Sequence, residues 1–265
     1  MKILFIGDIF GRPGRETVQK LLPDLITEYS PDLVLANAEN LSHGSGFSRK
    51  TIAEMRDAGV DFFTTGNHVW DNSDGVEHLS NSDFPVIRPA NFPDEDVTPG
   101  KGFKIIEARN GEKVLVINLL GKVFMKKDLA CPFRTMDRIL EETKDEDVSA
   151  IFLDFHAETT AEKYALAYHL DGHISAMVGT HTHIQTNDAR VVEKGTGYIS
   201  DTGMTGPYDS VIGVQKELVL KRFLTQLPVR FEPETSGQMV LSAFFVEVDP
   251  KTQKALRAEN IKKII

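Results

Sequence analysis

Cysteine is almost absent from this chain, and so are long apolar runs. The 265 residues include a single cysteine, Cys131, which excludes an internal disulfide framework and any metal cluster held by several thiolates. The first apolar run, residues 3–6, is too short for a signal peptide, and no run approaches the roughly 20 residues of a membrane span. We therefore expect a cytoplasmic protein without a membrane partner.

A surplus of positive charge is also missing. Lys and Arg number 30 against 39 Asp and Glu, which gives a net charge of −9, and the basic residues are scattered along the chain. Duplex nucleic acid requires a basic stripe that releases counterions from its phosphates, so no duplex partner is expected. A phosphate substrate would have to be attracted by something other than surface charge.

The composition is that of an ordinary globular protein, with 41% apolar and 26% charged residues. The length allows a full core and no flexible linker divides it, so we expect one domain over residues 1–265. Strand and helix patterns alternate at first, whereas alternating strands prevail after residue 184. A parallel first half and an antiparallel second half predict two facing sheets flanked by helices.

The same patterns predict the individual elements. Strands are expected at 3–6, 32–36, 60–65, 85–87, 103–108, 113–118, 148–153, 174–178, 189–192, 198–199, 229–231, 239–248 and 255–261. Helices are expected at 17–29, 48–59 with Ser48 as the cap, 134–144, 161–169 and 216–224, with a short helix between 71 and 83. Asn110-Gly111 predicts a hairpin.

Polar residues follow five of the predicted strands. They are Asp8, Glu39 with Asn40, Asn67 with His68, His156, and His181 with His183. Ligand crevices in open α/β sheets lie at the carboxyl ends of strands, so these residues are expected to converge. The last two histidines, at i and i+2, point the same way if the backbone stays extended. Taken singly, each residue also fits a helix cap, a turn or a core position, but five coincidences favour one site.

Counted as metal ligands, these residues offer three imidazoles, two carboxylates and two amide oxygens, with His68 held back. Seven groups are too many for one tetrahedral ion and suit two ions that share a bridging carboxylate. Nitrogen and oxygen donors without thiolate favour Fe, Mn, Zn or Co over Mg or Ca. Four positive charges against two carboxylates would make the pocket cationic, which explains how an acidic protein attracts an anion.

Such a pair of ions supports the hydrolysis of phosphate esters. It lowers the pKa of a bridging water towards about 7, and the resulting hydroxide attacks the phosphorus in line. The leaving alkoxide needs a proton, and His68 is placed to supply it; the alternatives are a metal ligand or a phosphate contact. His43, in a glycine-containing loop, is a candidate substrate contact or a plain loop residue. Arg12, Arg15 and Arg88 fit phosphate contacts or ordinary surface and salt-bridge positions.

Several stretches resemble the calcineurin-like metallophosphoesterases, and more closely the bacterial YmdB-like phosphodiesterases. The resemblance covers nearly the whole chain and is carried by Gly7-Asp8, Glu39-Asn40, Gly66-Asn67-His68, His156 and Gly179-Thr180-His181-Thr182-His183, together with residues 88–93, 154–158 and 201–209. Phe10 stands where the broad superfamily has a histidine, and Glu39-Asn40 stands where Gly-Asp is usual. Both departures belong to the YmdB-like subgroup.

The resemblance implies a four-layer α/β/β/α sandwich of two mixed sheets flanked by helices, with two divalent or trivalent ions, most often Fe or Mn. Carried over by motif, one ion is ligated by Asp8, Asn40 and His183 and the other by Asn67, His156 and His181. Glu39 then bridges the two ions, and His68 is the proton donor. The resemblance also implies a homo-oligomer.

The expected activity is hydrolysis of small phosphodiesters, including 2',3'- or 3',5'-cyclic nucleotides. Two alternatives remain open from the residues. One is a phosphomonoesterase or nucleotidase on the same di-metal centre. The other is a regulatory protein that binds a nucleotide without hydrolysing it, because binding and hydrolysis use the same ligands.

Overall fold

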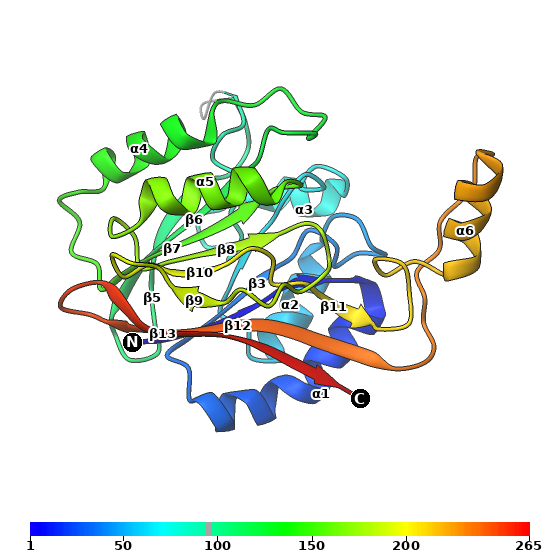
Figure 1. Ribbon diagram of the computed structural model, residues 1–265, viewed down its shortest axis with the longest axis horizontal. Helices are drawn as coiled ribbons and strands as arrows, with labels where there is room; N and C mark the ends of the chain where they lie inside the picture. Colours follow the sequence, from blue (N-terminus) through cyan, green and yellow to red (C-terminus); the bar gives the residue numbers. More distant parts are fainter. Residues whose placement is uncertain (94–96) are drawn as a thin grey trace.

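The computed structural model describes residues 1–93 and 97–265, in which two β-sheets lie face to face with helices on their outer sides (Figure 1). The strands are β1 (Lys2–Ile6), β2 (Asp8–Ile9), β3 (Leu33–Asn37), β4 (Phe62–Thr64), β5 (Phe103–Glu107), β6 (Lys113–Leu120), β7 (Ala150–His156), β8 (Ala176–Thr180), β9 (Arg190–Val191), β10 (Gly197–Ile199), β11 (Met204–Pro207), β12 (Met239–Asp249) and β13 (Lys254–Ile264). The helices are α1 (Gly11–Tyr29), α2 (Arg49–Asp57), α3 (Ser73–Leu79), α4 (Pro132–Glu142), α5 (Thr160–Leu170) and α6 (Lys216–Thr225).

The first sheet has the order β2-β11-β12-β1-β3-β4, and β13 pairs with β12. The strands β1, β3 and β4 run parallel, whereas β12 is antiparallel to both β1 and β13. A short parallel ladder joins β2 to β11. The carboxyl ends of β1, β3 and β4 therefore meet at one edge of this sheet.

The second sheet has the order β5-β6-β7-β8-β10-β9. Its centre, β6-β7-β8-β10, is parallel, and the edge strands β5 and β9 are antiparallel to their neighbours. The hairpin expected at Asn110-Gly111 is confirmed as the β5–β6 connection. The ladder from β6 through β7 to β8 continues to His156, which pairs with Thr180.

Three separate apolar clusters show that the fold has four layers. One packs the first sheet against α1, α2 and α3, one lies between the two sheets, and one packs the second sheet against α4 and α5. Within β1, Leu4 and Ile6 face the helices while Ile3 and Phe5 face the other sheet, as the alternation of strand side chains requires. The expected α/β/β/α sandwich of two mixed sheets is confirmed.

The division into a parallel first half and an antiparallel second half is wrong. The C-terminal hairpin β12–β13 joins the first sheet beside β1, and β10 and β11 each make a parallel pairing. Residues 229–231 form no strand, and within 85–87 only Val86 makes an isolated bridge. Two short strands, β2 and β11, escaped prediction because each is brief and β11 contains Pro207.

Helix α1 begins six residues earlier than its periodicity predicts. Gly11, Pro13 and Gly14 indicated a loop, yet they form the first turn, where proline is tolerated because its missing N–H has no helical partner. A Cβ on Gly14 would lie 2.5 Å from the Thr205 carbonyl oxygen, so glycine lets the helix approach β11. The Ser48 cap of α2 is confirmed: its hydroxyl accepts the Thr51 N–H.

Between β11 and β12 the chain leaves the sandwich as an arm, residues 208–238, that carries α6. In Figure 1 this helix stands away from the two sheets at the right of the view. Across residues 1–93 and 97–265, no helix combines the length and apolar character needed to cross a membrane.

Candidate metal centre

The five groups of polar residues singled out in the sequence meet at the carboxyl ends of the parallel strands. Asp8 lies in β2, just beyond β1, and the pairs Glu39–Asn40 and Asn67–His68 follow β3 and β4. His156 ends β7, and His181 and His183 follow β8. Because the two sheets face each other, both contribute donors to one buried cluster.

One donor set combines residues of both sheets. Donor atoms of Glu39, His156 and His181 all lie within 4.8 Å of one another. The His156 Nε2 atom is 3.1 Å from Glu39 Oε1, 3.0 Å from His181 Nδ1 and 3.1 Å from Asn67 Oδ1. The resemblance assigns Asn67, His156 and His181 to one ion and gives Glu39 as the bridge to the other.

A second donor set adjoins the first and shares Glu39 with it. Donor atoms of Asp8, Glu39 and His183 lie within 4.8 Å of one another, and His183 Nε2 is 3.2 Å from Asn40 Oδ1. Among the described residues, the buried Asp8 Oδ1 atom has no hydrogen-bond partner. An unpartnered carboxylate oxygen beside imidazole and amide donors fits a cation, so the residues present suit bound metal, and Glu39 belongs to both donor sets.

Each imidazole is held by its outer nitrogen. His156 Nδ1 lies 2.9 Å from Thr180 Oγ1, whose hydroxyl donates to Asp154. His181 Nε2 lies 3.0 Å from Glu158 Oε2, and His183 Nδ1 lies 3.0 Å from a backbone carbonyl in the arm, that of Ile212. Such partners fix the ring and leave the inner nitrogen for a metal.

The turn after β8 corrects the expectation of an extended backbone. His181 has φ 102° and His183 has φ 65°, so the two rings are aimed by a left-handed turn and not by strand alternation. Asp201 holds this turn by accepting the Thr182 N–H at 3.1 Å, and Lys163 Nζ donates to the same Asp201 oxygen at 2.8 Å. The turn directs one ring towards each donor set.

Burial is the largest influence on the ionisation of the clustered groups. It raises the pKa of Asp8 well above its ordinary value and, helped by His156, lowers the pKa of His181 to about 3. For Glu39, burial opposes ionisation, but the neighbouring His156 brings the pKa down to about 2. Burial likewise opposes a charge on His156, yet Glu39 and Asp8 raise its pKa to about 9. In the protein alone, positive charge at this point is thus supplied by a proton on His156.

Gly66 allows the two sheets to approach at the cluster. A Cβ at this position would lie 2.0 Å from Glu39 Oε2 and 2.6 Å from His156 Nε2. No side chain fits there without displacing both donors. The glycine before Asn67 is therefore a spatial requirement of the donor sets.

His68 lies at the edge of the cluster, half exposed. Its backbone N–H donates to Glu39 Oε2, and its ring Nδ1 lies 2.6 Å from Asp71 Oδ2. Burial tends to raise the pKa of Asp71, but hydrogen bonds from Ser45 and His68 lower it. With a hydrogen on Nδ1, His68 donates to Asp71 and keeps Nε2 for another partner.

A cavity of about 270 Å³ opens over the cluster. Its lining includes Glu39, Asn40, His43, His68, His181 and His183 from the sandwich, and Ile212, Val214, Phe231, Glu232 and Pro233 from the arm. The approach of the arm was not predicted from the sequence, because it depends on contacts between segments far apart in the chain. His43 does line the cavity, as expected of a substrate contact.

The three arginines considered as phosphate contacts lie elsewhere. Arg12 is exposed and pairs with Glu16, and Arg15 bonds to Glu54 and the Leu41 carbonyl. The fully buried Arg88 donates to the carbonyls of Pro89 and Pro99. Arg12 and Arg15 thus match the surface and salt-bridge alternative, whereas Arg88 is buried on backbone carbonyls, which neither alternative predicted.

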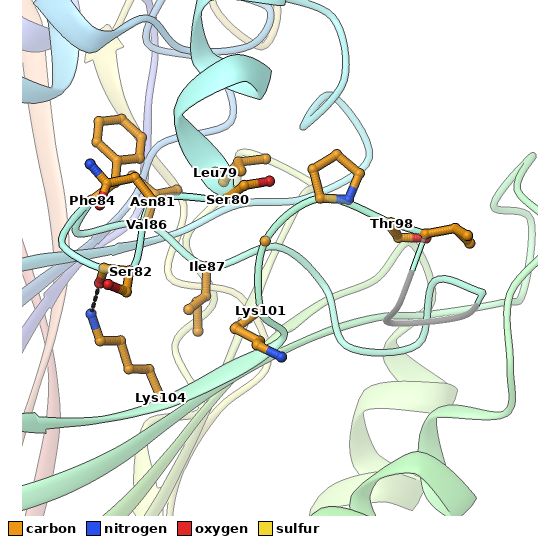
Figure 2. A pocket seen from close by; sticks show the side chains of 13 residues that line it. Leu79, Ser80, Asn81, Ser82, Phe84, Val86, Ile87, Thr98, Lys101 and Lys104 are labelled. Carbon is orange, nitrogen blue, oxygen red and sulfur yellow. Dashed lines mark hydrogen bonds between the residues drawn. The ribbon is translucent and has the colours of Figure 1, made fainter.

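A larger cavity, about 460 Å³, lies between the end of α3 and the start of β5 (Figure 2). Its described lining contains Lys101 and Lys104 but neither carboxylates nor imidazoles, and Lys104 is bonded to the Ser82 carbonyl. Because its described lining offers no carboxylate, imidazole or thiolate for a metal, this cavity is not the candidate metal site.

Two residues that support the histidines were missed. Asp154 lies between the sheets and accepts hydrogen bonds from Asn37 and Thr180, and Glu158 binds His181 from outside. The signal was present in part, because Asp154 and His156 stand at i and i+2 and so share one face of β7. Because the strand was predicted to end at residue 153, Asp154 and His156 were not recognised as neighbours on one strand face.

Known proteins match this chain over nearly its whole length. The sequence profile of the protein family described as YmdB-like protein matches residues 4–261. The chain is 45% identical over 262 residues to the 2',3'-cyclic-nucleotide 2'-phosphodiesterase of Bacillus subtilis (strain 168), covering 98% of this chain and 96% of that protein. A solved structure described as a novel phosphatase from Mycoplasma pneumoniae matches with a TM-score of 0.91 and 34% identity, over 100% of this chain and 93% of that chain. The 5'-nucleotidase precursor of Thermus thermophilus, at 13% identity, shares the fold with a TM-score of 0.56, over 100% of this chain and 54% of that chain.

Proposed function

Because the chain belongs to the YmdB-like protein family, we propose that it is a metal-dependent phosphodiesterase acting on small phosphodiesters, 2',3'- or 3',5'-cyclic nucleotides in particular. The name of the Bacillus subtilis relative supports the substrate class. The observation that carries the proposal is the pair of adjoining donor sets that share the buried Glu39. A carboxylate common to two adjoining donor sets suits two cations held close together, as two-metal phosphoester hydrolysis uses them.

Asp8, Asn40 and His183 would hold one ion, Asn67, His156 and His181 the other, and Glu39 both. Donors limited to nitrogen and oxygen favour Fe or Mn, with Zn or Co as alternatives. Bound there, the ions supply an activated water at neutral pH and neutralise the charge that develops on the phosphoryl oxygens.

The side chains around the ions orient the substrate and manage its protons. His68 lines the cavity and its Nδ1 lies 2.6 Å from Asp71 Oδ2. In the doubly protonated ring the Nδ1 hydrogen stays bonded to Asp71, and the Nε2 proton is the one donated to the departing alkoxide. His43 lines the same cavity and contacts the substrate beside the phosphate. Phe10 and the arm also line this cavity.

The test uses purified protein stripped of metal and reloaded with Mn, Fe, Zn or Co separately. Adenosine 2',3'-cyclic phosphate, adenosine 3',5'-cyclic phosphate, and a matched aryl phosphodiester and aryl phosphomonoester are then compared for turnover. We expect diester hydrolysis that depends on reloading, with the cyclic nucleotides cleaved in preference to the monoester. Faster hydrolysis of the monoester would favour a nucleotidase, and binding without turnover of any ester would favour a regulatory protein. Full activity in stripped protein would exclude the proposed site.

A further inference from the structure

The base of the arm, residues 211–215 and 231–234, is built as a small ordered platform beside the metal centre. Val211 and Val214 form an isolated bridge, and Val214 also bridges Pro233. The Gln215 N–H donates to the Glu232 carbonyl at 3.1 Å, and the Glu234 N–H donates to the Gly213 carbonyl at 2.9 Å. These bonds hold the two sides of the base together below α6.

The platform is attached directly to the donor sets. The Ile212 carbonyl accepts the Nδ1 hydrogen of His183 at 3.0 Å. Gly213, with φ 97°, packs so closely on Phe10 that a Cβ would lie 2.5 Å from the ring. The position of the platform relative to the metal centre is therefore set by the same contacts that orient His183.

The cavity has two unlike walls. Imidazole, amide and carboxylate groups form most of one, whereas the arm side is mainly apolar, with Ile212, Val214, Phe231 and Pro233 beside the single carboxylate of Glu232. Phe231 is 43% exposed, and the Arg222 guanidinium lies over its ring at 5.4 Å from the centroid. A phosphate alone makes no use of an exposed aromatic ring, but a planar base attached to it does.

We propose that Phe231 is a specificity-determining residue on which the base of a mononucleotide stacks while its phosphodiester lies at the metal centre. This inference rests on the proposed function and adds the part of the substrate that the arm recognises. A volume of about 270 Å³ is below the roughly 300–1,000 Å³ of pockets for drug-sized ligands, which favours one nucleotide unit over an oligonucleotide. Recognition by stacking tolerates different bases, because every base has a π-face.

The test compares adenosine 2',3'-cyclic phosphate with the methyl riboside 2',3'-cyclic phosphate, which has the same reacting group and no base. In Phe231→Ala, the ratio of kcat/KM for the nucleotide to kcat/KM for the base-free ester is expected to fall about tenfold, mainly through KM, since removing a stacking ring typically weakens binding by this order. Phe231→Tyr is expected to restore the ratio. Phe223→Ala is the matched control, because Phe223 is exposed on α6 and does not line the cavity.

Two results would overturn the inference: an unchanged ratio in Phe231→Ala, or an equal change in Phe223→Ala. Circular dichroism and metal content of each variant separate a loss of the base contact from a loss of folding. Calorimetric binding of adenosine 3'-monophosphate and ribose phosphate to the metal-loaded protein gives a readout that needs no turnover. If no ester is hydrolysed but Phe231→Ala still weakens the binding of adenosine 3'-monophosphate about tenfold and leaves that of ribose phosphate unchanged, base stacking on Phe231 is supported and the proposed activity is not. If both compounds bind Phe231→Ala as tightly as they bind the wild type, base stacking on Phe231 is rejected.

Discussion

Replacing Glu39 with glutamine removes one negative charge and keeps the size of the side chain. Glu39 is buried, belongs to both donor sets, and accepts the His68 N–H with Oε2. Loss of partners outside the ligand shell already weakens metal binding about 10–100-fold, so loss of a shared ligand is expected to weaken it by more. We expect Glu39→Gln to reduce the bound metal and to abolish measurable turnover.

The same substitution has a calculable effect on the metal-free protein. The pKa of His156 rises from 6.5 to about 9, against burial and chiefly through Glu39, which corresponds to roughly 3 kcal/mol for the buried pair, counted once. Because the folded pKa of His156 is raised, this stabilisation is complete below pH 6.5 and is lost as the pH rises through about 9. Because the pKa of Glu39 is lowered from 4.5 to about 2, it is also lost on acidification below pH 4.5.

The assay is the free energy of unfolding of metal-free wild type and variant between about pH 5 and pH 10, together with metal content by elemental analysis. We expect Glu39→Gln to be destabilised by about 3 kcal/mol near pH 6 and by much less near pH 10. Glu16→Gln, on the exposed Arg12–Glu16 pair, is the control and should change neither quantity. Full metal content with unchanged affinity in Glu39→Gln would refute the assignment of Glu39 to both ions.

Three further outcomes are expected. His68→Ala should keep its metal while turnover of cyclic nucleotides falls about 10²–10⁴-fold, with a smaller loss on an activated aryl phosphodiester; equal losses would show that His68 is not the acid. Glu158→Gln, which disturbs the outer nitrogen of His181, should weaken metal binding about 10–100-fold in a chelator competition, and an unchanged affinity would contradict its positioning role. Metal loading at pH 7 should release at least one proton, because the pKa of His156 is about 9 and a ligating imidazole is neutral; calorimetric heats that do not vary with the buffer's ionisation enthalpy would refute this.

The strand cores and their polar ends could be predicted because their signals are local. The run from Ile3 to Ile6 followed by Gly7-Asp8 is readable as a buried strand with an acid at its end, and β1 and β2 follow that pattern. Parallel pairing then brings the ends of such strands together whatever the chain does between them. The convergence of the donor residues could therefore be predicted without knowing how the loops are arranged.

Features decided by contacts between distant segments could not be predicted in the same way. Gly11, Pro13 and Gly14 favour a loop by local sequence. In the fold they form the first turn of α1, which packs against β11. The left-handed turn at His181 and His183 depends on Asp201 and Lys163, which lie well outside the turn on either side of it in the sequence. The arm reaches the cavity only because Phe10, Gly213 and His183 fit together in space.

Phe10, which stands where the broad superfamily has a histidine, packs between His183 and the arm. The Phe10 ring lies edge-on to His183, with centroids 5.8 Å apart, and a Cβ on either Gly44 or Gly213 would collide with it. A phenyl ring cannot ligate a cation. It packs edge-on against the His183 ring, while the Ile212 carbonyl holds the outer nitrogen of that ring. Asn40 Oδ1 lies 3.2 Å from His183 Nε2, and in the proposed centre this amide oxygen takes the place of the imidazole of the superfamily's histidine. The Phe10 ring and the Ile212 carbonyl thus join the His183 ring to the arm side of the cavity.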